Sequence, residues 1–300
     1  MTDFFVATFY RFVALNDHDE LRDRIEERCQ ELSIRGIILL AEEGINATVS
    51  GTRESVLSLL DFLKSDPRLS ALTWKESSAN RHPFRKLRVR LKKEIVTMGV
   101  PGVDPSRLVG TYVAPKNWNE LLDDPDVILV DTRNDYEVEI GTFQNAVNPN
   151  IKTFRELPAW CEANIDAGKK AKVAMFCTGG IRCEKSTAYL KEAGVEEVYH
   201  LEGGILKYLE EVSEEDSRWE GQCFVFDQRV SVGQGLAIGE HELCRGCRRP
   251  VSVAEKESEH YVRGVSCHRC FDETTPEQKA GFSERQRQLD SSGTKSKGTS

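Results

Sequence analysis

The first part of the chain alternates between two hydrophobic patterns, one typical of strands and one typical of helices. Aromatic and β-branched residues predict a strand over residues 4–13, and apolar residues three or four positions apart predict a helix over residues 19–32. The same criteria predict strands over 34–41, 46–50 and 72–77 and a helix over 53–64. The order strand-helix-strand-strand-helix-strand indicates a ferredoxin-like domain.

A basic segment, residues 84–96, follows this domain. Leu87, Val89 and Leu91 alternate with cations, so in a strand the apolar side chains face one side and the cations face the other. The four cations are Lys86, Arg88, Arg90 and Lys92. Such a surface attracts phosphate groups without reading a base sequence, so these four residues are the candidate RNA-binding residues. The alternative is an edge strand that its solvated charges protect from aggregation.

A different pattern begins near residue 113. Short apolar runs at 127–130, 173–176 and 198–200 predict buried strands, and helical stretches at 182–192 and 205–212 follow the last two. Short buried strands that alternate with helices indicate a parallel α/β sheet. The chain is therefore expected to hold an α+β ferredoxin-like domain (1–97), a linker (98–112), an α/β domain (113–218), a Cys-rich module (219–275) and a disordered tail (276–300).

Composition narrows the class of protein. The 300 residues carry a net charge of −8, but residues 101–220 carry 13 basic and 23 acidic side chains, a net charge of −10. Nucleic-acid binding therefore has to come from a local basic patch rather than from bulk charge. The chain has no apolar run near the ~20 residues of a membrane helix, and its first residues lack the features of a secretory signal. A cytoplasmic protein with no membrane partner is expected.

The strongest chemical signal is the segment Cys177-Thr-Gly-Gly-Ile-Arg182-Cys183, between a predicted strand and a predicted helix. The carboxyl ends of parallel strands are where α/β sheets place their sites. Glycines allow the loop to curl so that backbone N–H groups point inward, and the helix N-terminus and Arg182 add positive charge. These features favour the thiolate, so Cys177 is predicted to be a nucleophile of low pKa. The alternative is a buried structural cysteine.

Two further pairs of cysteines lie near the C-terminus. Cys244 and Cys247 form one CxxC pair, Cys267 and Cys270 form the other, and the 19 residues 248–266 separate them. This spacing fits a tetrahedral structural zinc site, and a metal would stabilise a segment that has few apolar residues. A redox dithiol pair or free thiols are the alternatives. Nine cysteines without a secretory signal fit metal or catalytic thiols better than a disulfide framework.

The α/β domain resembles a rhodanese domain. Four motifs carry the resemblance in the family's order: Val130-Asp131-Thr132-Arg133 with Tyr136-Glu137, Gly141 to Asn148, the loop from Cys177 to Arg182, and Val198 to Ile205. The resemblance implies that Cys177 carries a persulfide and that Arg182 closes the loop. It also implies a set of residues that support the loop, namely Asp131, Arg133, Thr178, Gly179 and Gly180.

The chain as a whole resembles the oxygen-dependent tRNA uridine hydroxylase family, because the ferredoxin-like domain, the basic strand, the loop and the two CxxC pairs occur together and in this order. The resemblance implies an oxidoreductase that converts the wobble uridine (position 34) of tRNA to 5-hydroxyuridine with O2, with tRNA as its partner. Cys177 is then the essential thiol. The alternative is a thiosulfate-type sulfurtransferase that works through a cysteine persulfide. A third hypothesis is a non-catalytic RNA- or protein-binding module that keeps a rhodanese scaffold. The presence of Cys177 and Arg182 disfavours it.

An O2-dependent hydroxylase requires an electron donor. The sequence has no Gly-rich fingerprint for a flavin or nicotinamide cofactor, and its six histidines are too scattered for a two-His-one-carboxylate iron site. It does have a second thiol, Cys183, six residues after Cys177. Such a pair is able to cycle through persulfide, sulfenic acid or disulfide states. The alternative is that Cys183 simply packs beneath the loop. Candidate platforms on which the target base could stack are Phe84, Trp118 and Phe143.

Overall fold

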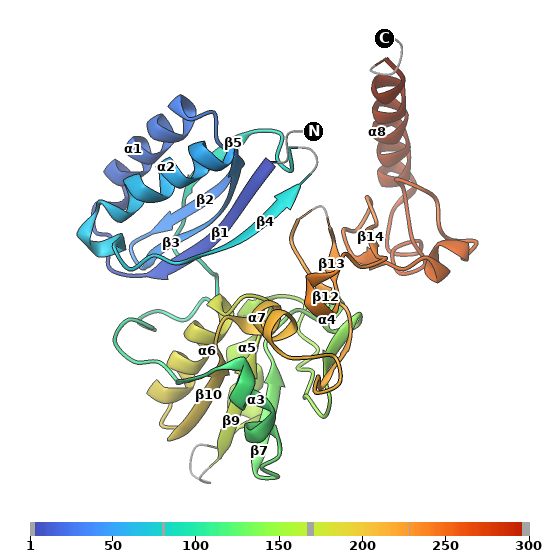
Figure 1. Cartoon of the computed structure of the whole chain (residues 1–300). Coiled ribbons are helices and arrows are strands. Elements are labelled where there is room, and N and C mark those ends of the chain that lie inside the picture. Colours follow the sequence, from blue (N-terminus) through green and yellow to red (C-terminus); the bar gives the residue numbers. More distant parts are fainter. Residues whose placement is uncertain (1–3, 80–81, 167–170, 228, 296–300) are drawn as a thin grey trace.

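The computed structural model describes residues 4–79, 82–166, 171–227 and 229–295. Its first domain is a five-stranded sheet with two helices (Figure 1). The elements are β1 (Phe4–Phe12), α1 (His18–Glu31), β2 (Arg35–Ala41), β3 (Gly44–Gly51), α2 (Arg53–Lys64), β4 (Trp74–Ala79) and β5 (Leu87–Leu91). The sheet order is β4-β1-β3-β2-β5, antiparallel except for the β2–β5 pair. The ferredoxin-like prediction is confirmed, and β5 extends the sheet at one edge.

Each helix of this domain has apolar residues every three or four positions and so has one apolar side. The apolar sides of both helices pack on the same face of the sheet. The buried residues of α2 are Val56, Leu59, Leu60 and Leu63. The hydroxyl of Thr52 caps this helix by accepting a hydrogen bond from the backbone N–H of Ser55 at 3.1 Å. Alternate strand residues complete the core from the sheet side; they include Phe5, Ala7, Phe9, Ile38, Leu40 and Val89.

The second domain is a parallel sheet between two layers of helices, as the sequence predicts. Its strands are β6 (Thr111–Val113), β7 (Val127–Asp131), β9 (Lys172–Phe176) and β10 (Glu197–Leu201), in the order β6-β10-β9-β7. The remaining elements are α3 (Pro115–Leu122), α4 (Asp135–Val138), β8 (Gly141–Phe143), α5 (Leu157–Asn164), α6 (Ile181–Glu192) and α7 (Gly204–Glu211). Val173 and Met175 pack with α5 and α6, whereas Ala174 and Phe176 pack with α3 and α7. Strand β9 is therefore buried on both faces.

The cores of the second domain reach beyond the boundaries that the sequence suggested. Met98 and Val103, in the segment expected to be a linker, are buried with residues of α5 and α6. After α7, β11 (Trp219–Gly221) pairs with β8, and Trp219 and Val232 belong to the core around α7. Apolar side chains on both flanks of the predicted domain explain this extension. The other short strands are β12 (Cys223–Phe224), β13 (Ser231–Val232), β14 (Glu242–Leu243) and β15 (Pro250–Val251).

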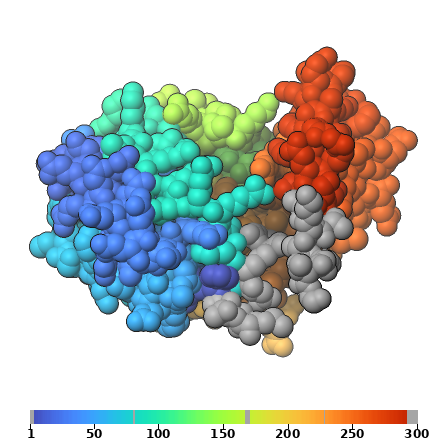
Figure 2. Space-filling model, turned by 90° about the horizontal axis from the view of Figure 1, so that it is seen from above, coloured from blue at the N-terminus to red at the C-terminus, as the bar shows by residue number. Residues whose placement is uncertain are grey.

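The predicted disordered tail is wrong for residues 276–295, which form α8 (Pro276–Lys295), while residues 296–300 lie outside the described residues. The N-terminus of α8 has a reciprocal cap. The Thr275 N–H donates to Gln278 Oε1 at 3.0 Å, and the Gln278 N–H donates to Thr275 Oγ1 at 3.3 Å. Low apolar content concealed a helix that consists largely of good helix formers. Figure 1 shows α8 projecting away from both domains, and Figure 2 shows the C-terminal segment and the first domain on opposite sides of the surface.

No helix within the described ranges has both the length and the apolar character needed to cross a membrane.

A buried lysine joins the two domains. Lys185 of α6 is 1% exposed, and its Nζ lies 2.6 Å from Glu43 Oε2 and 2.6 Å from Glu94 Oε2. It also donates to the carbonyl oxygen of Val96 at 3.1 Å. One cation therefore balances two carboxylates that approach it from the first domain and from the segment after β5.

We expect Lys185→Met to lower the free energy of unfolding by about 3 kcal/mol, because removing one partner of a buried ion pair leaves uncompensated charge. The value lies at the low end of the usual range because about a fifth of each carboxylate side chain is exposed. Urea unfolding followed by tryptophan fluorescence measures the change. The control is Lys116→Met on the exposed surface of α3, where a change within about 0.5 kcal/mol is expected. Equal effects of the two variants would contradict the role of Lys185.

Candidate active site

Cys177 lies where β9 ends and its loop leads into α6. The cysteine is 1% exposed, and its Sγ accepts a hydrogen bond from the backbone N–H of Gly180 at 3.1 Å. Gly180 has φ +105°, a conformation that L side chains rarely adopt. The glycine therefore lets the loop turn back so that its N–H points at the sulfur.

The surroundings of Cys177 stabilise a thiolate. Burial by itself raises the pKa of this thiol. Hydrogen bonds from the Cys183 thiol and from the backbone N–H groups of Cys183 and Gly180, together with the Arg182 guanidinium, outweigh burial and lower the pKa of Cys177 to about 5. For Cys183, burial and the adjacent sulfur raise the pKa well above its usual value. Near neutral pH the loop therefore contains one thiolate, Cys177, and one neutral thiol, Cys183, which donates to it.

A buried carboxylate positions Arg182. Glu137 of α4 is fully buried, and its two oxygens accept from the Arg182 guanidinium at 2.7 and 2.8 Å. Thr178 donates to the same carboxylate at 3.3 Å. Glu137 belongs to one of the four rhodanese-like motifs, but no role was predicted for it from the sequence. A local signal existed, because Glu137 also completes a capping box with Asn134 at the start of α4.

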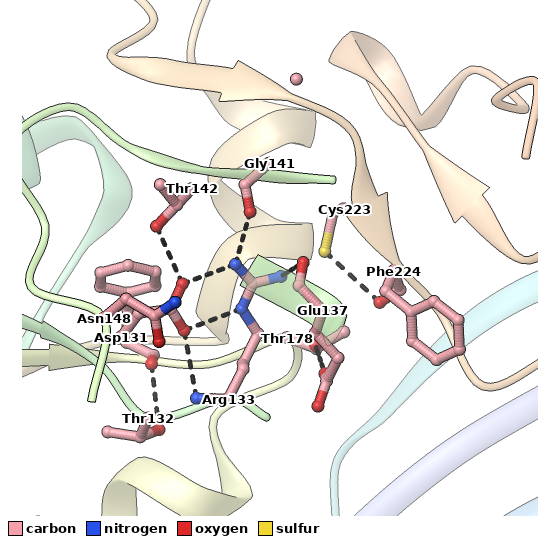
Figure 3. Close-up of polar contacts among 12 residues, drawn as sticks. Asp131, Thr132, Arg133, Glu137, Gly141, Thr142, Asn148, Thr178, Cys223 and Phe224 are labelled. Carbon is pink, nitrogen blue, oxygen red and sulfur yellow. Dashed lines mark hydrogen bonds and ion pairs between the residues drawn. The ribbon is translucent and has the colours of Figure 1, made fainter. Parts of the chain in front are cut away.

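A second buried ion pair, between Arg133 and Asp131, lies next to Glu137 (Figure 3). The Arg133 guanidinium donates to Asp131 at 2.9 and 2.6 Å, to the carbonyl oxygen of Glu137 at 3.1 Å and to that of Gly141 at 2.6 Å. Both charged side chains are fully buried. Arg133 thus connects Asp131 to the backbone of Glu137, and the Glu137 carboxylate contacts Arg182 and Thr178. The neighbouring Cys223 stays a neutral thiol, because burial raises its pKa to about 12.

Three residues that the sequence did not single out also lie at the loop. Tyr10 of β1 donates to Glu184 Oε1 of α6 at 2.7 Å, and Lys75 of β4 donates to the carbonyl oxygen of Gly203. These contacts join residues 174 and 128 positions apart. No local pattern could have revealed them, since only the packing of one domain on the other brings them together.

The basic strand is confirmed as a strand over Leu87–Leu91, at the sheet edge. Val89 is buried, but Leu91 is 45% exposed, so the apolar side of the strand is incompletely covered. All four predicted RNA-binding cations are exposed: Lys86, Arg88, Arg90 and Lys92. Two of the suggested stacking platforms are excluded, because Trp118 and Phe143 are fully buried in the second domain. Their aromatic character serves packing.

The four C-terminal cysteines come together as one cluster. Their Sγ atoms all lie within 4.8 Å of one another. Cys244 and Cys270 are 3.8 Å apart at sulfur, as are Cys247 and Cys267. A tetrahedral ion with bonds of about 2.3 Å to sulfur needs edges of about 3.8 Å. The donor set and its spacing therefore fit a metal ion.

Both domains match families of known proteins. Residues 4–95 match the family described as UPF0176 acylphosphatase like domain, and residues 114–211 match the Rhodanese-like domain family. A relative from Teredinibacter turnerae, "tRNA uridine(34) hydroxylase", is 58% identical over 97% of this chain and 90% of its own length. The chain belongs to the tRNA uridine(34) hydroxylase family. Another member, from Acaryochloris marina, is 54% identical over 97% of this chain and 94% of its own. Membership in the hydroxylase family confirms the resemblance inferred from the motifs, together with the fold class.

Proposed function

We propose that this protein hydroxylates the wobble uridine, position 34, of tRNA to 5-hydroxyuridine with O2 as the oxidant. The observation that carries the proposal is the buried thiolate of Cys177 in a chain that aligns over 97% of its length with a relative named tRNA uridine(34) hydroxylase. A thiolate can act as a nucleophile or as a reductant, and either role suits oxidation of a uracil ring. The proposal makes the protein a cytoplasmic oxidoreductase whose partner is tRNA.

The two thiols of the loop balance the reaction. Transfer of one oxygen atom from O2 to C5 of uridine needs two electrons, because the other oxygen leaves as water. Uridine, O2 and two thiols then give 5-hydroxyuridine, water and a Cys177–Cys183 disulfide, and an external thiol reductant restores the two thiols. Cys183 suits this role because its thiol already donates to the Cys177 sulfur within the buried loop.

The test of the proposal is oxygen labelling. Purified protein, tRNA transcript and a thiol reductant are incubated under ¹⁸O2, and the nucleosides are analysed by mass spectrometry. The proposal predicts 5-hydroxyuridine that carries one ¹⁸O. Unmodified uridine, or product labelled only from H2¹⁸O, would contradict it.

A second candidate function is sulfur transfer, because the Gly180 N–H and Arg182 stabilise an anionic sulfur whatever it carries. In this reaction the Cys177 thiolate takes the outer sulfur of thiosulfate, sulfite leaves, and the persulfide passes its sulfur to an acceptor. Small-molecule sulfur transfer has no need of the basic strand or the four-cysteine cluster. An assay of thiosulfate-to-cyanide transfer, run beside the ¹⁸O2 experiment, distinguishes the two functions.

We expect Cys183→Ser to lose hydroxylation over repeated turnovers, because serine cannot form the disulfide. Product formed per enzyme is measured with excess reductant. The matched control is Cys161→Ser, a buried cysteine of α5 outside the loop. Full activity of Cys183→Ser would remove the disulfide step and leave Cys177 acting alone.

We further propose that the metal of the four-cysteine cluster is zinc with a structural role, held by Cys244, Cys247, Cys267 and Cys270. Zinc bound by four thiolates closes its coordination shell and supplies folding energy. We expect one zinc per chain by elemental analysis, and none in Cys267→Ser. Binding worth about 10–16 kcal/mol in zinc-finger peptides implies that residues 242–270 lose hydrogen-exchange protection in this variant. Zinc retained by Cys267→Ser, or protection that is unchanged, would contradict the assignment.

A further inference from the structure

The first domain reaches the thiol loop with two side chains. The Tyr10 hydroxyl lies so close to the loop that a Cβ on Gly180 would be 2.8 Å from it. Gly180 is the residue whose N–H binds the Cys177 sulfur. Lys75 donates to Gly203, and the N–H of Ile205, two residues on, donates to the carbonyl oxygen of Cys177 at 3.0 Å. Both side chains therefore contact backbone that itself contacts Cys177 or its loop.

Both side chains come from the sheet face opposite α1 and α2, which we call the helix-free face. Phe9 of β1 points into the core on the helix side. Thr8 and Tyr10 therefore lie on the helix-free face, because successive strand residues point to opposite sides. The register pairs Thr8 with Lys75, which places Lys75 on the same face.

One cross-strand row of the helix-free face connects the thiol loop with the basic edge strand. The register runs from Lys75 to Thr8, from Thr8 to Thr48, from Thr48 to Ile37 and from Ile37 to Arg88. The row crosses five strands, about 19 Å at 4.7–4.9 Å per strand. Thr8 and Arg88 are exposed, and Ile37 is 39% exposed. Lys75 and Thr48 are half-buried. The row thus has a half-buried cation at the thiol end, an exposed cation at the other end, and small or apolar side chains between them, of which Thr8 and Ile37 are accessible.

We propose that the helix-free face binds the single-stranded anticodon loop of tRNA and delivers the target uridine to Cys177, with Lys75 and Tyr10 as positioning residues. This inference rests on the proposed function. Charge supports an RNA occupant, because Arg88 and Arg90 belong to this face whereas residues 101–220 carry a net charge of −10. Bases of an unpaired loop are free to lie on Ile37 and the threonines. The thiol loop also offers room for the target, since a Cβ on Gly179 would meet nothing within 4 Å.

Photo-crosslinking tests where the target nucleotide lies. The probe is an anticodon stem-loop RNA with 5-iodouridine at position 34, irradiated with the full-length protein and mapped by peptide mass spectrometry. The proposal predicts a crosslink to the β1 peptide that contains Tyr10. Phe226 offers a competing position, because it is 66% exposed and its ring centroid lies 5.9 Å from the Arg182 guanidinium carbon. Crosslinks to Phe226 or α8 without any to β1 would overturn the proposal.

Salt dependence tests the cation at the thiol end of the row. Each phosphate contact to a single strand contributes about 0.7 to the slope of log affinity against log salt. Lys75→Gln should bind the stem-loop more weakly with a slope smaller by about 0.7, which a packing defect alone would not produce. Thr8→Glu should weaken binding by charge repulsion, because Thr8 lies next to Lys75 in the row and is exposed. The controls are Lys116→Gln on α3 and Thr111→Glu on β6, both exposed positions of the second domain. Unchanged slope and affinity in Lys75→Gln and Thr8→Glu would overturn the proposal.

The crosslinking experiment and the ¹⁸O2 labelling experiment test the RNA surface and the reaction independently of each other. If no 5-hydroxyuridine forms while 5-iodouridine crosslinks to the Tyr10 peptide, the proposed reaction is wrong and the RNA surface stands. If 5-hydroxyuridine forms while the crosslinks map only elsewhere, the reaction stands and the surface is wrong.

Discussion

Replacing Cys177 by serine is expected to abolish 5-hydroxyuridine formation. A serine hydroxyl does not ionise near neutral pH, so the hydrogen bonds that stabilise the thiolate would point at a neutral oxygen. Serine also forms neither a persulfide nor a disulfide. Loss of a nucleophile lowers turnover by on the order of 10⁴-fold or more in enzymes whose other groups remain in place. The effect is measured by mass spectrometry of nucleosides from total tRNA. The tRNA comes from deletion cells that carry either the wild-type protein or Cys177→Ser.

The control for this experiment is another buried cysteine. Cys161→Ser makes the same atomic change in α5, where burial keeps the thiol neutral by raising its pKa to about 12. This variant should restore the modification. Binding of tRNA by Cys177→Ser should remain close to wild type, because the thiol lies beneath the loop and the proposed RNA contacts lie on the first domain. Restoration of 5-hydroxyuridine by Cys177→Ser would refute a catalytic role for the thiolate.

Local signals explain what the sequence predicted well. The helix over 53–64 was predicted with its observed bounds, because a capping threonine precedes a clear three-four apolar spacing. The position of Cys177 at the end of a buried strand also followed from local residues, since the strand, the glycines and the helix are adjacent in the chain. The approach of four cysteines could be predicted because CxxC spacing constrains geometry directly.

The rest of the site depends on packing between distant segments. Glu137 accepts hydrogen bonds from Arg182, which lies 45 positions later in the chain. Tyr10 donates to Glu184, which lies 174 positions later. Neither pairing leaves a periodic trace in the sequence. The aromatic residues illustrate a different limit, because pattern alone cannot tell a core ring such as Phe143 from an exposed ring such as Phe226. The helix α8 was missed because the prediction of a disordered tail used only its low apolar content, whereas good helix formers and the Thr275–Gln278 cap stabilise it.

The second large effect is expected at Arg182, whose charge helps keep Cys177 ionised. Removal of an opposite charge at close range raises the pKa of a thiol by about 1 to 3. From about 5 in wild type, the pKa of Cys177 in Arg182→Gln should therefore rise to between about 6 and 8. Alkylation by iodoacetamide reports the thiolate, so the wild-type rate should level off above pH 6, whereas the variant's rate should still increase through pH 7. Superimposable profiles would show that Arg182 does not set the ionisation.

The buried carboxylate complicates this variant and also supplies its control. Arg182→Gln leaves Glu137 buried without its cation, which costs stability independently of the thiol. The double variant Glu137→Gln, Arg182→Gln removes both charges, so it should regain stability while the thiol pKa stays raised.

A lowered thiol pKa also stabilises the folded chain at pH values above the unfolded thiol pKa, and this contribution is lost as pH falls through about 5. The wild-type stability advantage over the double variant should therefore shrink from pH 8 to pH 5 in urea unfolding. An advantage that is constant across this range would mean that the buried ion pair, rather than the thiolate, accounts for the whole effect of Arg182.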